Sequence, residues 1–354
     1  MTNQMTAAVY HASGDVRIEK LDVPTPTTGE VLIKVLRSGM CGTDASEYKS
    51  GPKIFPTVTR HAASGHLGPM VLGHEFIGEI VGQPDPTGSF KPGDVVASGA
   101  GISCGSCKRC VEGRTNLCDS YVTLGLNRHG GMAEYVAVPT STLVKVPEGL
   151  NLDAAGIAQP LAVGLHAARR SGVKNGDRVL LIGAGAIGTF VLSALKHLFQ
   201  VEVTVLDFGG TRLERAARLG ADHTVEVGEE ATSNIKASFQ NKPIDVVIEA
   251  SGAPGQLQFS IEMVRRGGNI LQVGLPTSRQ EIDIHKIVMS EIDIHTTLAH
   301  VCGQDLGVAL EILATTHLAA ELIEGVYPLS EVSNQLELLS TGKIQGKVLF
   351  NPEL

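Results

Sequence analysis

Short apolar runs separated by turn residues fill the first part of the chain, up to about Leu143. Runs such as Glu30–Leu36, Ile77–Val81 and Val95–Ala97 alternate with glycine- and proline-rich turns, for example Lys91-Pro92-Gly93-Asp94. Runs bounded in this way are typical of β-strands, because glycine and proline interrupt regular elements. The pattern predicts an irregular, β-rich first domain with long loops.

From about Gly176 the pattern changes to apolar strands that alternate with helical stretches. The predicted strands are Val179–Ile182, Val201–Asp207, Val246–Ala250 and Ile270–Val273. Such alternation is typical of βαβ units, so this part of the chain should form a parallel sheet covered by helices.

The last part of the chain, from about Thr297, holds a helical stretch around Leu306–Ala314 and a strand-like run at Lys347–Phe350. This end of the chain can fold back and pack with the first domain. A chain of 354 residues also exceeds the usual size of a single hydrophobic core, so two domains are expected.

Composition favours an enzyme of the α/β class. Hydrophobic residues make up 43% and charged residues 19%, which excludes a disordered chain. The 29 Lys and Arg against 37 Asp and Glu give a net charge of −8, so nucleic acid and anionic membranes are poor candidate partners. The segment Met1–Lys20 lacks a secretory pattern, and the uncharged run Val179–Leu195 is interrupted by glycines. We therefore expect a cytoplasmic protein, whose six cysteines indicate metal binding more than disulfides.

A dinucleotide-binding fingerprint follows the strand that ends at Ile182. The segment Gly183-Ala184-Gly185-Ala186-Ile187-Gly188 precedes an apolar helical pattern, as phosphate binding at a helix N-terminus requires. Nineteen residues after Gly188, Asp207 ends the next strand, where a carboxylate can bind the adenosine ribose and repel a 2′-phosphate. These features favour NAD over NADP, although a glycine-rich turn alone is weak evidence. Arg212 either stacks on the adenine or is a solvated helix residue.

Four cysteines lie in one short loop, at positions Cys104, Cys107, Cys110 and Cys118. Four thiolates this close together suit a closed tetrahedral zinc site, and their spacing matches neither common ferredoxin pattern. A closed site leaves no position for substrate, so we expect a structural zinc.

A second group of metal ligands is predicted from Cys41, in the segment Cys41-Gly42-Thr43-Asp44, and from Gly73-His74-Glu75. Cysteine, histidine and glutamate supply three mixed ligands and leave one position open, as catalytic zinc requires. Each residue alone has a simpler interpretation, as a core thiol, a buried histidine and a surface carboxylate.

Together these motifs make the chain similar to the zinc-containing medium-chain dehydrogenases, and the resemblance covers essentially the whole chain. The family also carries a pattern like Gly130-Gly131-Met132-Ala133-Glu134-Tyr135, and Glu75 directly after His74 resembles the polyol, butanediol, threonine and sugar dehydrogenase branch. Within that branch, the segment Glu47-Tyr48-Lys49-Ser50-Gly51-Pro52 most resembles the (R,R)-butanediol dehydrogenases.

The resemblance implies a fold and a domain division. It implies a doubly wound, Rossmann parallel sheet over residues 161–298, and a GroES-like catalytic domain over 1–160 and 299–354 with the zinc lobe at about 99–120. It also implies a homodimer or homotetramer, with NAD and two zinc ions per chain as cofactors.

The resemblance further implies residue roles. Cys41, His74 and Glu75 would hold the catalytic zinc, and Asp44 would orient His74. Thr43 would take the hydroxyl proton of the substrate, although it is also placed to cap the following helix.

Three positions depart from the family pattern. Ser46 replaces the histidine that usually ends the proton relay, and Gln159 replaces the glutamate that usually contributes, directly or through water, to the zinc site. The arginine–tyrosine pair of animal-type sorbitol dehydrogenases falls near Ala299-His300. With Tyr48, these two residues are expected to line a pocket suited to a short diol.

The function predicted from the sequence is therefore NAD-dependent interconversion of a secondary alcohol and its ketone, with a vicinal diol or acyloin such as 2,3-butanediol and acetoin as the first candidate. A sorbitol- or L-iditol-type polyol and aldose oxidation at C1 are the alternatives. A catalytically silent nucleotide-binding member is disfavoured, because the three zinc ligands are all present.

Overall fold

The computed structural model describes residues 4–82 and 88–354, and its contacts divide the chain into two compact units. One unit comprises Met1–Gln159 and Val301–Leu354, and the other comprises Pro160–His300. The helix α4 (Ala158–Arg170) contains the first boundary between them.

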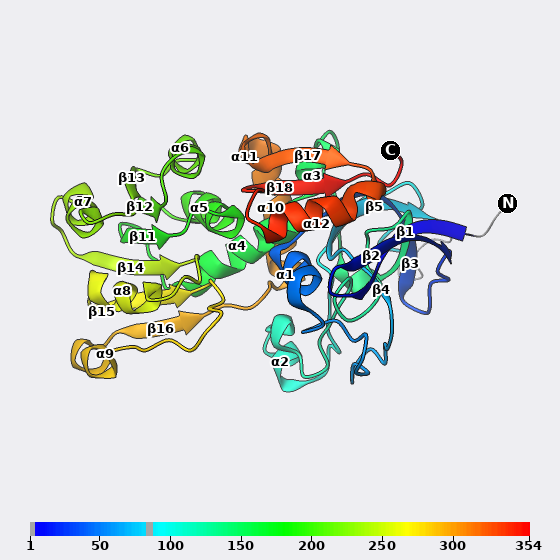
Figure 1. Cartoon of the computed structure of the whole chain (residues 1–354), viewed down its shortest axis with the longest axis horizontal. Coiled ribbons are helices and arrows are strands. Elements are labelled where there is room, and N and C mark those ends of the chain that lie inside the picture. The colour runs from blue at the N-terminus through cyan, green and yellow to red at the C-terminus, as the bar shows by residue number, and fades with distance from the viewer. Residues whose placement is uncertain (1–3, 83–87) are drawn as a thin grey trace. The chain divides into compact units, whose positions relative to one another are not determined.

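The unit of residues 160–300 is built on a six-stranded parallel sheet. Its strands lie in the order β13-β12-β11-β14-β15-β16, which Figure 1 shows as neighbouring arrows. This order reverses between β11 and β14, which is the arrangement of a doubly wound dinucleotide-binding sheet. The strands are β11 (Arg178–Ile182), β12 (Glu202–Asp207), β13 (His223–Glu226), β14 (Ile244–Glu249), β15 (Val264–Gln272) and β16 (Asp293–Thr296).

Burial explains why these apolar runs become central strands. All six residues of β14 are buried, as expected for a parallel strand that is covered by helices on both faces. Leu180, Val247 and Ile270 of three adjacent strands join one hydrophobic cluster. The helices of this unit, besides α4, are α5 (Ala186–Leu198), α6 (Thr211–Arg218), α7 (Ala231–Ser238), α8 (Gln256–Met263) and α9 (Ile284–Ser290).

The other unit is rich in β-structure, as the sequence predicts. Its largest sheet has the order β10-β6-β5-β3-β18-β17, with β9 also paired to β3, and a second sheet has the order β2-β1-β4. The strands are β1 (Gln4–Ala12), β2 (Asp15–Asp22), β3 (Glu30–Gly39), β4 (Met70–Val71), β5 (Glu75–Val81), β6 (Val95–Ser98), β7 (Gly101–Ile102), β8 (Val122–Thr123), β9 (Tyr135–Pro139), β10 (Leu143–Lys145), β17 (Ile323–Tyr327) and β18 (Lys347–Phe350).

The register of the larger sheet gathers distant parts of the chain around the end of β3. Gly39 at that end pairs with Glu75 of β5 on one side and with Leu349 of β18 on the other. Helices of this unit are α1 (Gly42–Ser50), α2 (Lys108–Val111), α3 (Leu152–Ala155), α10 (Cys302–Thr315), α11 (Leu318–Leu322) and α12 (Val332–Ser340), with short 3-10 turns at Thr115–Leu117, Thr140–Thr142 and Leu329–Glu331.

No helix within residues 4–82 and 88–354 combines the length and the apolar composition needed to cross a membrane. The predicted fold class, a parallel dinucleotide-type sheet with a β-rich second unit, is confirmed.

Candidate metal centres and dinucleotide site

The strand register brings the three predicted catalytic zinc ligands together. Cys41 caps α1 directly after β3, His74 precedes β5, and Glu75 is the first residue of β5. One ligand atom of each side chain lies within 4.8 Å of the others, and both His74 and Glu75 are buried. A thiol, an imidazole and a carboxylate form a donor set that suits zinc.

Asp44 connects two of these residues. Its Oδ2 accepts a hydrogen bond from the backbone N–H of Cys41 at 2.9 Å, and its Oδ1 lies 3.6 Å from Nδ1 of His74. Burial lowers the pKa of His74, but the nearby Asp44, Cys41 and Glu75 outweigh it and raise this pKa to about 10. The negative groups around the ring therefore form a buried site that attracts a cation, as a metal centre requires.

Lys347, which the sequence analysis did not single out, completes this region. It begins β18, is only 4% exposed, and places its ammonium Nζ 2.5 Å from Oε2 of Glu75 and 2.5 Å from the carbonyl oxygen of Met40. Its signal in the sequence is weak: one lysine at the start of an otherwise apolar strand.

The predicted proton-transfer residues lie on α1. The Thr43 hydroxyl is 3.8 Å from Sγ of Cys41, and the hydroxyl of Ser46 accepts a hydrogen bond from Nζ of Lys53 at 2.8 Å. Gln159, in place of the usual glutamate, is 9% exposed. Tyr48 packs against a hydrophobic cluster of its own unit, His300 is buried, and Ala299 has a left-handed backbone with φ of +48°.

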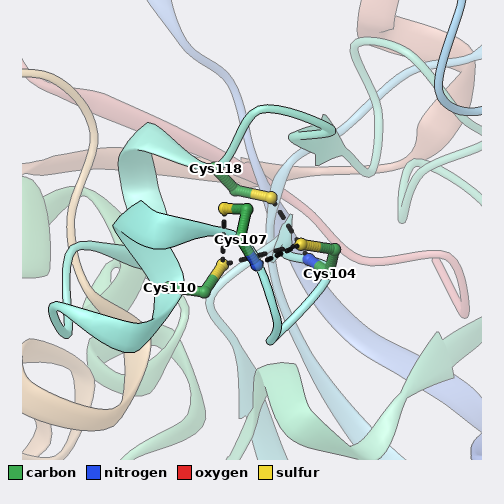
Figure 2. Close-up of side chains that lie close together, drawn as sticks. All are labelled: Cys104, Cys107, Cys110 and Cys118. Atoms are coloured by element: carbon green, nitrogen blue, oxygen red, sulfur yellow. Dashed lines mark hydrogen bonds between the residues drawn. The ribbon is translucent and has the colours of Figure 1, made fainter.

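The four-cysteine loop forms a second group of metal-ligating side chains. Figure 2 shows the four sulfur atoms of Cys104, Cys107, Cys110 and Cys118 turned toward one another, and all lie within 4.8 Å. Sγ of Cys110 is 3.6 Å from that of Cys107 and 4.0 Å from that of Cys104. These distances are close to the edge of about 3.8 Å of a tetrahedron with a Zn–S bond of about 2.3 Å.

Backbone N–H groups donate hydrogen bonds to two of these sulfurs, and such donors favour the thiolate form that binds a metal. The N–H of Cys107 donates to Sγ of Cys104 at 3.3 Å, and the N–H of Cys104 donates to Sγ of Cys118 at 3.2 Å. Donors from Ser106 and Cys107 lower the pKa of Cys104 to about 6, whereas burial raises that of Cys110 to about 11. Two further features are typical of a closed thiolate zinc site: the segments between the cysteines are short, and all four side chains of the group are thiols.

In the other unit, the fingerprint adopts the strand, turn and helix geometry that dinucleotide binding requires. Gly183 follows β11 with φ of +96°, and a Cβ on Gly188 would overlap the carbonyl oxygen of Gly183. Gly185 caps α5, and, apart from Gly185 itself and its neighbours along the chain, none of the described atoms lies within 4 Å of the position that a Cβ there would take. The free space and the helix N-terminus beside Gly185 fit a pyrophosphate.

Asp207 lies at the end of β12 and is tied to this turn. Its Oδ2 accepts a hydrogen bond from the Ala184 N–H at 2.5 Å, and its Oδ1 accepts one from the Phe208 N–H at 2.6 Å. Arg212 approaches Oδ1 at 3.5 Å. The carboxylate thus holds the fingerprint turn in place, a role that the spacing of residues did not reveal.

Comparisons with known proteins agree with this geometry. Residues 27–148 match the family described as "Alcohol dehydrogenase GroES-like domain", and residues 186–314 match the family described as "Zinc-binding dehydrogenase". Sorbitol dehydrogenase from Bacillus subtilis strain 168 is 33% identical over 339 residues, which cover 94% of this chain and 93% of that protein.

Solved structures support the same family. The 2R,3R-butanediol dehydrogenase from Bacillus subtilis has a TM-score of 0.90 and 29% identity, covering 98% of this chain and 99% of that one. A protein from Sinorhizobium meliloti 1021 described as a zinc-binding dehydrogenase, solved with bound NADP, has a TM-score of 0.85 and 27% identity, covering 99% of each chain. The family expected from the motifs is confirmed. The chain belongs to the zinc-binding alcohol dehydrogenase family and is an oxidoreductase.

Proposed function

We propose that the protein is an NAD-dependent zinc dehydrogenase that interconverts a secondary alcohol and its ketone, with a vicinal diol or acyloin as its substrate class. The carrying observation is that Cys41, His74 and Glu75 meet within 4.8 Å in the unit that contains the GroES-like match. This mixed donor set leaves a coordination position for substrate, whereas the four-cysteine loop does not. We assign one zinc to each group and NAD to the fingerprint.

When bound, the catalytic zinc supplies positive charge to the substrate oxygen and NAD supplies the acceptor for hydride. The protein's own residues then have separate tasks. Asp44, whose Oδ1 lies 3.6 Å from Nδ1 of His74, would orient the ring of His74 as a ligand. Thr43 takes the proton of the substrate hydroxyl, and Lys347 balances the charge of Glu75.

The onward path of the proton differs from the family pattern. Ser46 stands where a histidine usually accepts the proton, and its hydroxyl is paired with the ammonium of Lys53. A hydroxyl can pass a proton within a hydrogen-bonded chain but cannot store it as an imidazole does. We therefore propose that the proton passes from Thr43 towards solvent without being held at position 46, and that the ribose hydroxyls of a bound cofactor would supply further hydrogen-bonding groups for this transfer.

Gln159 provides a test of the metal environment. If its amide lies beside the zinc site, Gln159→Glu adds a negative charge there and should slow the loss of zinc to a chelator about tenfold. Chelator-dependent zinc release at constant pH measures this effect, with exposed Gln200→Glu as the control. Equal release rates in the wild type and in Gln159→Glu would place Gln159 outside the metal environment.

The relatives support two substrate classes. The butanediol dehydrogenase of known structure favours a vicinal diol such as 2,3-butanediol, and the sorbitol dehydrogenase relative favours a longer polyol. A screen of NAD reduction over 2,3-butanediol, sorbitol, aldoses and simple secondary alcohols, with acetoin as the reverse substrate, separates them. We expect the highest kcat/KM for 2,3-butanediol or acetoin. An equal or higher kcat/KM for sorbitol would mean that the substrate class is a longer polyol and not a vicinal diol.

We also propose that the protein acts in the cytoplasm as a symmetric homo-oligomer. All six cysteines are free, and the five that we propose as zinc ligands need a reducing compartment to stay so. The edge strand β16 and its surroundings carry exposed apolar side chains, among them Val288, Ile294 and Leu298. Antiparallel pairing of β16 with a second copy, centred on Ile294, would place Asp293 of one copy opposite His295 of the other. The carboxylate and the imidazole could then pair across the two-fold axis.

A further inference from the structure

Besides Asp207, the unit of residues 160–300 has a buried carboxylate at the carboxyl end of β14. Glu249 is 1% exposed and is the last residue of this strand. Its Oε1 accepts hydrogen bonds from the N–H of Ser251 at 2.7 Å, from the hydroxyl of Ser251 and from the N–H of Gly252 at 3.0 Å. Its Oε2 accepts from the N–H of Gly252 at 3.0 Å and from Nε2 of Gln272 at 2.5 Å.

These contacts tie together the loops that follow two adjacent strands. Gln272 ends β15, and its Nε2 also donates to the carbonyl oxygen of Gly274 at 2.7 Å. The backbones are in direct contact as well, because a Cβ on Gly274 would overlap the N–H of Gly252. The backbone N–H of Gly274 donates to the carbonyl oxygen of Glu249 at 2.9 Å. Glu249 and Gln272 therefore set the position of one loop against the other.

The same loop also touches the dinucleotide fingerprint. A Cβ on Gly183 would lie 2.9 Å from the backbone nitrogen of Ser251, and the Ala250 N–H donates to the carbonyl oxygen of Ile182 at 2.8 Å. These contacts are made by backbone atoms, so the fingerprint turn is held without the Glu249 side chain. The carboxylate of Glu249 instead holds the loops after β14 and β15 against each other.

The place of Glu249 in the sheet indicates which part of a dinucleotide it serves. Dinucleotides bind beyond the carboxyl ends of the strands, with one mononucleotide half on each side of the point where strand order reverses. The fingerprint after β11 and Asp207 after β12 belong to the adenosine side. The strands β14, β15 and β16 form the other side, so the loops held by Glu249 and Gln272 lie on the nicotinamide side.

We propose that Glu249, through Gln272 and the loops after β14 and β15, is a positioning residue for the nicotinamide half of the cofactor. The inference rests on the proposed NAD site. It gives Glu249 a role on the nicotinamide side of that site, although Glu249 would touch no cofactor atom. A carboxylate accepting from neutral donors holds them more strongly than an amide does, because charge-assisted hydrogen bonds are stronger. Glu249→Gln also turns one acceptor into a donor that faces Gln272 and Gly252.

The test compares binding of NADH with binding of ADP-ribose, which lacks the nicotinamide ring, by isothermal titration calorimetry on the zinc-loaded, full-length protein. We expect Glu249→Gln to raise the Kd of NADH about tenfold, the value of one charge-assisted hydrogen bond, and to change that of ADP-ribose less than about twofold. The enhancement of NADH fluorescence on binding should fall in parallel.

Three further variants separate positioning from a general loss of structure. Asp245→Asn is the matched control, because Asp245 lies on the same strand and accepts the backbone N–H of Arg178 at 2.9 Å near the opposite end of β14. It should leave the ratio of the two Kd values unchanged. Glu249→Gln combined with Gln272→Glu restores a donor–acceptor pair and should recover most of the NADH affinity. Gln272→Met should also raise the Kd of NADH more than that of ADP-ribose. It replaces Glu249→Gln in the test if that variant does not fold.

Each outcome has a definite meaning. Equal weakening of NADH and ADP-ribose in Glu249→Gln, or an unchanged NADH Kd, would overturn the positioning role. Failure of the wild type to bind either ligand would instead overturn the proposed NAD site.

Discussion

At the scale of single residues, Lys347 and Glu75 form a buried ion pair between positions 272 residues apart in the chain. Sequence patterns report on neighbours along the chain, so neither the pairing nor its proximity to the candidate metal centre could be predicted. The candidate ligands themselves could be proposed from the sequence, because cysteine, histidine and glutamate in short motifs are residue types that bind zinc. Glu249 was missed for a related reason: three of its five hydrogen bonds come from backbone N–H groups, which every sequence contains.

The first prediction at this scale concerns Lys347→Met. Removing the ammonium leaves the buried carboxylate of Glu75 without its partner, which should cost the metal-free protein about 3–5 kcal/mol. Zinc should compensate part of that cost, so its addition should raise Tm more in the variant than in the wild type. Thermal unfolding with and without zinc measures the difference, and Lys34→Met, which breaks the exposed pair with Glu353, is the control. Equal zinc-dependent shifts in all three proteins would contradict the charge-balancing role.

The second prediction concerns Asp207→Ser and cofactor choice. Two anions about 4 Å apart repel by about 1 kcal/mol even in water, so the carboxylate should discriminate against a 2′-phosphate. Asp207 also holds the Ala184 N–H, so the variant should lose NAD affinity through loosening of the turn as well. We expect kcat/KM for NAD to fall at least tenfold and that for NADP to change little or rise. A wild type that uses both cofactors equally would show that Asp207 does not face the ribose.

At the scale of elements, most central strands were predictable and the edge strands were not. The run Lys347–Phe350 becomes β18 with the expected bounds, because three consecutive apolar residues follow the lysine. By contrast, β13 (His223–Glu226) and β16 (Asp293–Thr296) lie at the two edges of the six-stranded sheet. Both are rich in polar residues, so no apolar run in the sequence predicts them. β15 begins earlier than expected because Arg265 and Arg266 interrupt its apolar pattern.

The third prediction contrasts the two metal-ligating groups. Cys41→Ser should remove most activity while leaving the protein folded, because β3, β5 and β18 hold that region without the thiol. Cys107→Ser should instead lower Tm and solubility, because α2 has no buried residue of its own that would order the loop without a metal. Elemental analysis should give about two zinc ions per wild-type chain and about one in either variant. A zinc-free protein with full turnover would contradict both assignments.

At the scale of the whole molecule, the fourth prediction concerns self-association through β16. A charge at the centre of an antiparallel pair repels its own copy, so Ile294→Lys should convert the oligomer to a smaller species. Light scattering coupled to size-exclusion chromatography gives the mass, and Ile18→Lys, an exposed apolar position in the other unit, is the control. A monomeric wild type, or an Ile294→Lys variant of unchanged mass, would argue against this interface.

The pairing of β18 with β3 also has a consequence for biosynthesis. On the ribosome, Cys41, His74 and Glu75 are made long before Lys347, and at about 5–20 residues per second the interval lasts about 14–54 s. During that time the carboxylate of Glu75 has no lysine beside it. Until β18 pairs with β3, this group of ligands therefore carries one negative charge that no lysine balances, so zinc supply during translation should affect the yield of folded enzyme.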